Sequence, residues 1–251
     1  MKSAIRLTLI LIMVPTYAFA EPSAPYHQET TQVKTAGKIV GRVRAEGPHE
    51  RPAPLKVYKN RDFCGATVPN ESFVVNPEGG LRNAVIIVPG FRREKAERQI
   101  KTLILDNKNC AFVPHVQVAP VRSELLLLNS DPILHDVHAR LGLETLFNVG
   151  LPTWRQVKKR LTRTGIVTID CDVLHTWMTA YIVVTSDSYY AVSDQRGEFI
   201  IEGVPAGTYE VRVWHEKLGS RFRRVTVSGG STLRLDLVYK WPSLFKDQSS
   251  S

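Results

Sequence analysis

Hydrophobic and polar residues alternate with a period of two over most of the chain, in short runs separated by turn-forming residues. Such alternation is typical of strands that bury one face, and turns rich in glycine, proline and aspartate end the runs. The runs that predict strands cover residues 38–43, 83–88, 112–118, 124–128, 165–169, 181–185, 198–201, 208–214, 221–227 and 232–239. Short strands at this spacing predict an all-β chain built from sandwiches or barrels.

Two segments depart from the strand pattern and predict helix. Residues 154–161 are the main candidate and residues 93–100 are a second. The main candidate contains three residues of a basic cluster, Lys158, Lys159 and Arg160, and the fourth, Arg163, follows it. These side chains form either a solvated helix face or a docking patch for an acidic partner protein, because electrostatic steering speeds transient encounters.

The first residues resemble a secretory signal. Lys2 and Arg6 supply a positive start, an apolar run covers residues 7–14, and small residues at 18–20 offer a cleavage site. The apolar run is too short to span a bilayer, which favours removal over the alternative of an uncleaved anchor. We therefore expect residues 1–20 to be a cleaved signal peptide and the mature chain to lie in the periplasm.

Charge and composition restrict the partners. The chain has 33 Lys and Arg residues against 24 Asp and Glu residues, a net charge of +9. Basic character raises the question of nucleic acid, but export argues against it and favours an acidic protein partner. Polar segments at 21–36 and 241–251 predict a flexible leader and a loose tail. No stretch after the leader is long and apolar enough to predict a membrane span.

The three cysteines, Cys64, Cys110 and Cys171, leave an odd thiol in an oxidising compartment. Three pairings are possible. We expect a disulfide between Cys64 and Cys110, because Cys171 has metal-ligand neighbours and the other two cysteines do not. The alternative for Cys171 is a buried free thiol in the core.

The strongest chemical signal is the run Cys-Asp-Val-Leu-His-Thr-Trp-Met at residues 171–178. A thiolate, an imidazole and a thioether on one short loop form a soft ligand set that suits copper, whereas structural zinc sites prefer more thiolates or histidines. Met178 is the only methionine beyond the expected signal peptide. The alternative is that His175 and Met178 are core residues beside a free thiol.

An upstream segment strengthens the copper interpretation. A Phe-x-Pro motif at 112–114 leads to a strand that ends in Asn129-x-Asp131, and His135 follows. This order, with Cys-x3-His-x2-Met far downstream, resembles the cupredoxin family. The resemblance implies a Greek-key β-sandwich and one copper ion held by His135, Cys171, His175 and Met178.

The resemblance also implies roles for the neighbouring residues. Met178 would be a weak axial ligand. Asn129, and similarly Asp131, would form hydrogen bonds behind the ligands, although Asp131 is alternatively a turn residue. His138 is a possible additional ligand or a replacement for His135, but a residue three positions along an extended chain faces the other side. The loop resembles half of the binuclear motif of cytochrome oxidase subunit II, whose extra cysteine is Val167 here, so we expect one ion.

The last third of the chain carries a different signature. The run 193–199 (Ser-Asp-Gln-Arg-Gly-Glu-Phe) precedes the run 203–209 (Gly-Val-Pro-Ala-Gly-Thr-Tyr). Together they resemble the carboxypeptidase regulatory-like (transthyretin-like) sandwich, a non-catalytic module. We expect this module over 185–240 and a cupredoxin-like copper domain over 95–184. The β segment 37–94 belongs to either of them, and the copper domain is possibly inserted in a sandwich formed by the flanking segments.

The expected function combines these inferences. The combination of modules resembles bacterial envelope proteins labelled as methylamine-utilisation proteins. We expect an exported mononuclear copper-binding protein that transfers electrons to a redox partner. Copper carriage or sensing would use the same ligands, and an envelope adhesion or assembly module with a vestigial metal site is a third hypothesis. The sequence has no paired catalytic carboxylates, nucleophile motif, phosphate loop or haem-attachment motif, so we expect no enzyme; a red-copper-type redox enzyme is the enzymatic alternative.

Overall fold

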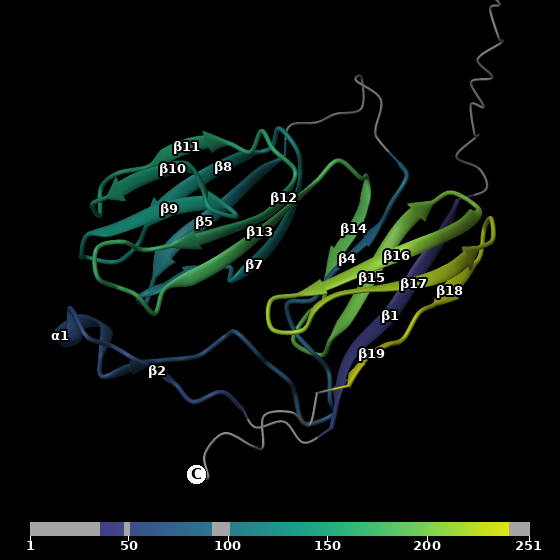
Figure 1. The fold of residues 1–251 in the computed structure, drawn as a ribbon, viewed down its shortest axis with the longest axis horizontal. Helices are drawn as coiled ribbons and strands as arrows, with labels where there is room; N and C mark the ends of the chain where they lie inside the picture. Colours follow the sequence, from purple (N-terminus) through teal and green to yellow (C-terminus); the bar gives the residue numbers. More distant parts are fainter. Residues whose placement is uncertain (1–35, 48–50, 92–100, 241–251) are drawn as a thin grey trace, which may run out of the picture. The chain divides into compact units, whose positions relative to one another are not determined.

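The structure is a computed structural model that describes residues 36–47, 51–91 and 101–240. Within these ranges the chain is almost entirely β, with one short helix (Figure 1). The predictions for residues 1–20, 93–100 and 241–251, and for all of the leader except Ala36, lie outside the described residues. None of the described helical segments has the length and apolar character needed to cross a membrane.

Residues 102–185 form a β-sandwich, which we call the first sandwich. Its five-stranded sheet has the order β10 (Glu144–Leu151), β9 (His135–Leu141), β12 (Gly165–Asp170), β13 (Thr179–Thr185) and β7 (Val116–Pro120). Its four-stranded sheet has the order β11 (Val157–Arg160), β8 (Glu124–Asn129), β5 (Thr102–Lys108) and β6 (Ala111–Val113). Strands β5 and β8 pair in parallel, as do β7 and β13, so the chain crosses between sheets as in a Greek-key sandwich.

The first sandwich is held together by the inward-facing half of its alternating residues. Along β8 the buried positions are every second residue, as the period-two pattern predicts. Side chains from both sheets form one apolar cluster, which includes Leu105, Leu125, Leu127, Val137, Ile169 and Ile182. Burial of such aliphatic side chains stabilises the fold by about 1.5–3 kcal/mol each.

The remaining strands form a second sandwich. One sheet contains β15 (Glu198–Val204) and β1 (Gly37–Glu46), with β18 (Thr232–Arg234) and β19 (Leu237–Lys240) both pairing with β1. The other sheet has the order β14 (Tyr189–Val192), β4 (Val85–Val88), β16 (Gly207–His215) and β17 (Gly219–Val227). Its core includes Ile39, Val43, Ile86, Phe199, Val211 and Tyr239. The chain is therefore all-β, with two sandwiches, as the periodicity predicts.

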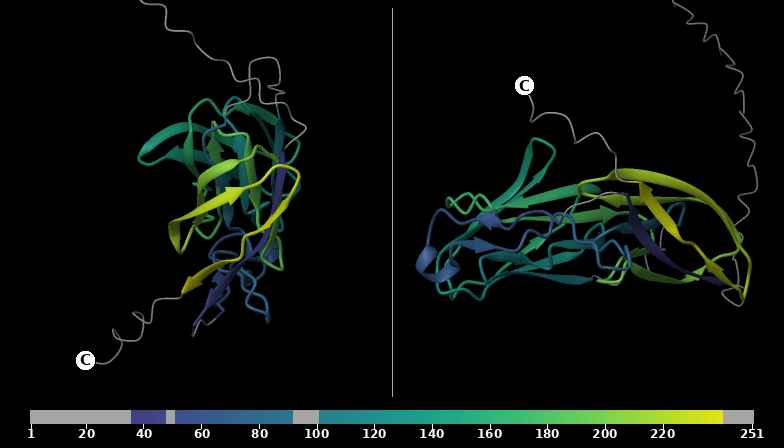
Figure 2. Two further views of the ribbon diagram at one scale, coloured as in Figure 1. Left: turned by 90° about the vertical axis from the view of Figure 1, so that its right-hand side faces the viewer. Right: turned by 90° about the horizontal axis from the view of Figure 1, so that it is seen from below.

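The described residues of the segment 37–94 contribute to both sandwiches. Strands β1 and β4 belong to the second (Figure 1). In contrast, β2 (Leu55–Lys56), α1 (Arg61–Cys64) and β3 (Thr67–Val68) lie in a segment that packs against the first. Val57 and Val68 are buried in the core cluster of the first sandwich. In the right-hand view of Figure 2, α1 lies at one end of that sandwich.

The prediction of a helix over residues 154–161 is wrong. Residues 157–160 form the edge strand β11, which pairs with β8 so that Val157 lies opposite Leu127. Pairing and half-burial of alternate side chains override the helix propensity of Lys and Arg. Two of the basic side chains face Glu124, with Lys158 at 3.9 Å and Arg160 at 3.7 Å. Charged residues on an edge strand also discourage pairing with other chains.

Two predicted strands are interrupted. The run 112–118 is divided into β6 and β7, and the run 232–239 into β18 and β19. Besides β11, three strands of the first sandwich, β5, β9 and β10, are not among the predicted runs. Strand β9 begins at His135 and mixes charged with apolar residues, which hides its alternation.

Candidate metal centre

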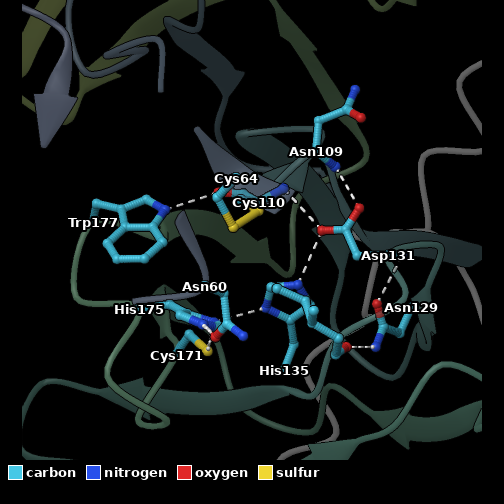
Figure 3. Close-up of a disulfide and its surroundings, with 11 residues drawn as sticks. Asn60, Cys64, Asn109, Cys110, Asn129, Asp131, His135, Cys171, His175 and Trp177 are labelled. Atoms are coloured by element: carbon cyan, nitrogen blue, oxygen red, sulfur yellow. Dashed lines mark hydrogen bonds and ion pairs between the residues drawn. A yellow bond between two sulfur atoms is a disulfide. The ribbon is translucent and has the colours of Figure 1, made fainter. Parts of the chain in front are cut away.

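Three ligand-type side chains meet at one end of the first sandwich (Figure 3). The Nδ1 atoms of His135 and His175 are 3.1 Å apart, and Nδ1 of His175 lies 3.7 Å from Sγ of Cys171. Both histidines are fully buried and Cys171 is 3% exposed. Within the described part of the chain, these three are the residues whose His, Cys, Asp or Glu atoms cluster closely enough to hold a metal ion.

Strand register explains why residues so distant in sequence meet. Strands β9 and β12 are antiparallel neighbours, with Asp170 opposite His138. The chain leaving β12 at Cys171 therefore passes the start of β9, and the backbone N–H of Asp136 donates to Sγ of Cys171 at 3.4 Å. The loop from Cys171 then carries His175 back over this sheet end before β13 begins.

The outer nitrogens of both histidines are occupied by oxygen acceptors. Nε2 of His135 lies 3.0 Å from a carboxylate oxygen of Asp131, and Nε2 of His175 lies 2.8 Å from Oδ1 of Asn60. Because these oxygens accept hydrogen bonds, each imidazole carries its proton on Nε2, which leaves a lone pair on each Nδ1. Two lone pairs that face each other at 3.1 Å repel unless a cation lies between them. The geometry therefore fits a site for a metal cation.

The predicted supporting residues lie behind His135. The carboxylate of Asp131 also accepts the backbone N–H groups of Asn109 at 2.7 Å and Cys110 at 2.8 Å. The side chain of Asn129 donates to the carbonyls of Ile133 and Leu151 and accepts from the backbone of Asp131 (Figure 3). These bonds fix the turn between β8 and β9, and so they orient the His135 ring.

Burial favours the uncharged forms of the two imidazoles and the thiol. Burial lowers the pKa of His135, and burial together with the nearby His135 and Lys59 lowers the pKa of His175 to about 4. Burial also raises the pKa of the Cys171 thiol. The two imidazoles are therefore uncharged near neutral pH, and binding a cation to sulfur requires release of the thiol proton.

The two remaining candidate ligands, Met178 and His138, have different surroundings. Met178 is 2% exposed, belongs to the same core cluster as Cys171, and donates its backbone N–H to the carbonyl of His175 at 2.8 Å. His138 lies outside the cluster: its Nε2 is 2.7 Å from Oγ1 of Thr145 and its Nδ1 is 2.8 Å from Asp172. His135 and His138 thus face different sides of β9, as expected for residues three positions apart.

The disulfide between Cys64 and Cys110 is present, and Cys171 is a free, buried cysteine. Cys110 also accepts a hydrogen bond at its carbonyl from the indole of Trp177, which lies on the ligand loop, at 3.0 Å. The sequence analysis missed Asn60, the partner of His175. Its one signal was its position four residues before a cysteine expected to form a disulfide.

Comparisons with known proteins match both parts of the chain. The model of the family "Carboxypeptidase regulatory-like domain" matches residues 178–240. No curated protein sequence matches the chain. Among solved structures, a purple cupredoxin from Nitrosopumilus maritimus is similar to 34% of this chain over 99% of its own length, with 20% identity and a TM-score of 0.30.

Two further copper proteins are similar to this chain. A reduced mutant of amicyanin is 17% identical, with a TM-score of 0.31, over 40% of this chain and 98% of its own length. A copper-containing nitrite reductase from Thermus scotoductus is 19% identical, also with a TM-score of 0.31, over 39% of this chain and 25% of its own length. The two families that the sequence motifs resemble, cupredoxins and carboxypeptidase regulatory-like domains, are thus both represented among the matches.

Proposed function

We propose that this chain binds one copper ion through His135, Cys171 and His175, with Met178 as a weak axial ligand. The observation that carries the proposal is the pair of buried Nδ1 atoms 3.1 Å apart beside a buried thiol, with each outer nitrogen bonded to an oxygen. Two imidazole nitrogens and one thiolate, with a thioether available, form a donor set that suits copper better than structural zinc.

The proposed role is electron transfer in the periplasm. A copper ion held there would supply one-electron chemistry. The chain's own residues keep the site rigid: Asp131 and Asn129 fix the turn before His135, and Trp177 ties the ligand loop to Cys110. A site that is preorganised in this way needs little rearrangement when the charge on the ion changes. We propose a redox protein as the partner and no catalytic activity of the chain itself.

One observation favours copper carriage as a second candidate. The His175 side chain is fully buried, and its outer nitrogen is bonded to Asn60. Covering this ligand lengthens the path for electrons to a partner protein, which disfavours electron transfer. It also slows loss of the ion, which favours copper carriage. The two functions are distinguished by comparing the electron self-exchange rate of the loaded protein with the rate of Cu(I) transfer to a chelator.

The primary test is a copper titration of the purified protein, followed by visible absorption. We expect one equivalent of Cu(II) to bind and to give an intense band, because thiolate bound to Cu(II) absorbs strongly. The Cys171→Ser variant is the matched control, since it removes the sulfur with little change of volume, and it should lack this band. An unchanged spectrum in that variant would refute the ligand assignment, and a protein that binds no copper would favour an adhesion or assembly module.

A further inference from the structure

We propose that residues 55–68 form a cover over the metal centre, in which Asn60 is the positioning residue for His175 and the Cys64–Cys110 disulfide is the tether. The inference rests on the proposed function, because it concerns how the same site is held and closed. It assigns a role to a segment that lies more than 100 positions from the ligand it contacts.

The cover packs against the first sandwich through apolar contacts. Leu55 and Cys64 lie against the core cluster to which Val57 and Val68 belong. Strands β2 and β3 pair with each other, and the backbone N–H of Val57 donates to the carbonyl of Ala66 at 3.0 Å, which closes the segment into a compact loop. The side chain of Lys59 adds a contact to the ligand loop, donating to the carbonyl of Val173 at 3.1 Å.

Asn60 has an unusual conformation that leaves its side chain available to the site. It occupies the position before α1 with left-handed backbone angles, φ 54 and ψ 38, which cost little for asparagine. An asparagine at this position normally accepts a hydrogen bond from the first turn of its own helix, but here its side chain makes no such bond. Oδ1 instead accepts from Nε2–H of His175 at 2.8 Å.

The bond from Asn60 determines which nitrogen faces the metal. With Nε2 protonated and bonded to Asn60, the His175 ring presents Nδ1 to the centre, opposite Nδ1 of His135. Without that acceptor the ring can exchange its proton between the two nitrogens, and part of the population would lose the donor lone pair at the centre. Asn60 thus acts through His175 and is not itself a ligand.

The disulfide connects the cover to the support of the other histidine. Cys64 lies four residues after Asn60 and is bonded to Cys110. The backbone N–H of Cys110 donates to the carboxylate of Asp131, which in turn binds Nε2 of His135 (Figure 3). One covalent bond therefore joins the segments that orient the two imidazoles. Copper can reach or leave the His175 side of the centre only when the cover moves.

The test uses Asn60→Gly, which keeps the left-handed backbone and removes the acceptor. The matched control is Asn109→Gly, because Asn109 has a similar φ of 53 and glycine keeps the backbone N–H that binds Asp131. The side chain that this control removes lies away from both histidines (Figure 3). In the copper-free proteins, ¹⁵N shifts of the His175 ring report its tautomer. We expect the native protein and the control to show the Nε2–H form, and Asn60→Gly to show a mixture.

The second measurement is the rate of Cu(I) transfer from each loaded protein to bathocuproine disulfonate. Loss of one buried hydrogen bond should speed transfer by up to about tenfold in Asn60→Gly. The double variant Cys64→Ser/Cys110→Ser should also transfer faster, because its cover is no longer tethered. Asn60→Asp keeps an oxygen acceptor and should restore the Nε2–H tautomer.

The outcomes separate this inference from the proposed function. If Asn60→Gly matches the Asn109→Gly control in both tautomer and transfer rate, the role of Asn60 is refuted. If copper does not bind to the native protein, the proposed function fails, while the tautomer measurement still decides whether Asn60 positions His175. If the disulfide variant transfers copper at the native rate, the tether is refuted.

Discussion

The two sandwiches bury very different kinds of side chain. The core of the second sandwich is formed by aliphatic and aromatic residues, and His215 is a lone buried histidine beside it. The first sandwich has a comparable apolar cluster, but one end of it buries Asp131, His135, His175 and the thiol of Cys171. Both sandwiches are built from strands with the same period-two pattern, so the difference lies in the side chains at the strand ends and in the adjoining loops.

This contrast indicates separate roles for the two halves. Buried polar groups cost free energy unless they are hydrogen-bonded. At the end of the first sandwich the buried groups have polar partners: Asn129 binds the backbone of Asp131, Asp131 binds His135, and Asn60 binds His175. The second sandwich has no such series of bonded buried side chains among its described residues and contributes stability. Variants at the end of the first sandwich should therefore affect mainly copper binding, and variants in the second sandwich should affect mainly the free energy of unfolding.

The largest expected effect distinguishes two histidines of the same strand. His135→Ala should weaken copper binding by more than about a hundredfold, because loss of a direct ligand exceeds the tenfold to hundredfold effect of losing an outer partner. His138→Ala should leave the visible spectrum nearly intact, since this ring bonds to Thr145 and lies beside Asp172, away from the other two ligands. Parallel copper titrations measure both. Loss of binding in the His138 variant alone would show that the wrong histidine was assigned.

The next prediction concerns stability of the second sandwich. Gly197 has φ +75, and a Cβ atom there would lie 2.2 Å from the carbonyl oxygen of Val43 and 2.8 Å from the backbone nitrogen of Leu81. Gly197→Ala should lower the free energy of unfolding by more than about 3 kcal/mol, because backbone strain and a backbone clash add. Urea unfolding followed by circular dichroism measures this.

The control for that substitution lies in the first sandwich. Gly142 also has positive φ (+62), but nothing lies within 4 Å of the position of an added Cβ. Gly142→Ala should therefore lower the free energy of unfolding by only about 1–2 kcal/mol, which is the strain of an alanine with left-handed backbone angles. An equal decrease in the free energy of unfolding of the two variants would contradict the proposed clash at Gly197.

A pH-dependent loss of stability should arise in the second sandwich. Burial lowers the pKa of His215 to about 4, and the nearby His115 and Lys217 add to the effect. The unfolded chain, with an ordinary pKa near 6.5, binds this proton more readily, so stability is full above pH 6.5 and falls as the pH is lowered towards 4. The contribution lost between pH 7 and pH 5 should be about 2 kcal/mol.

The His215→Gln variant isolates this contribution, because glutamine stays neutral over the whole range. Urea unfolding at pH 7 and pH 5 should show a smaller pH dependence for the variant than for the native protein. An identical dependence in the two proteins would mean that other groups cause the acid destabilisation.

The smallest effect is expected for Met178→Leu. The swap nearly conserves volume in a buried position, so it should change the free energy of unfolding by less than about 1.5 kcal/mol. Because an axial ligand tunes a copper site rather than creating it, the intense absorption should remain while the reduction potential shifts. Spectroscopy and voltammetry on the same sample test both expectations. A lost band would indicate that Met178 is needed to form the site.

Local sequence patterns predicted much of the fold and the core of the site. Alternation marked most strands, and the ligand loop at 171–178 was recognisable because its donors lie within one short segment. Strand β11 was mistaken for a helix, since its edge position depends on pairing with β8. Asn60 could not be found from local patterns, because its bond to His175 exists only once the cover has folded onto the first sandwich.

The interleaved order of the chain sets the order in which the two sandwiches can form. Strand β1 pairs with β15, β18 and β19, so that Ile39 lies opposite Ile201, whereas the strands of the first sandwich follow one another within residues 102–185. Closing a long loop costs entropy before its contacts form, and pairing between distant segments is slow. During synthesis β1 and β4 must therefore stay unpaired until their partner strands within residues 189–240 have been made. The candidate metal centre can assemble earlier, because its ligands lie within residues 135–178. At that stage the strands that pair with β1 and β4 are still being made.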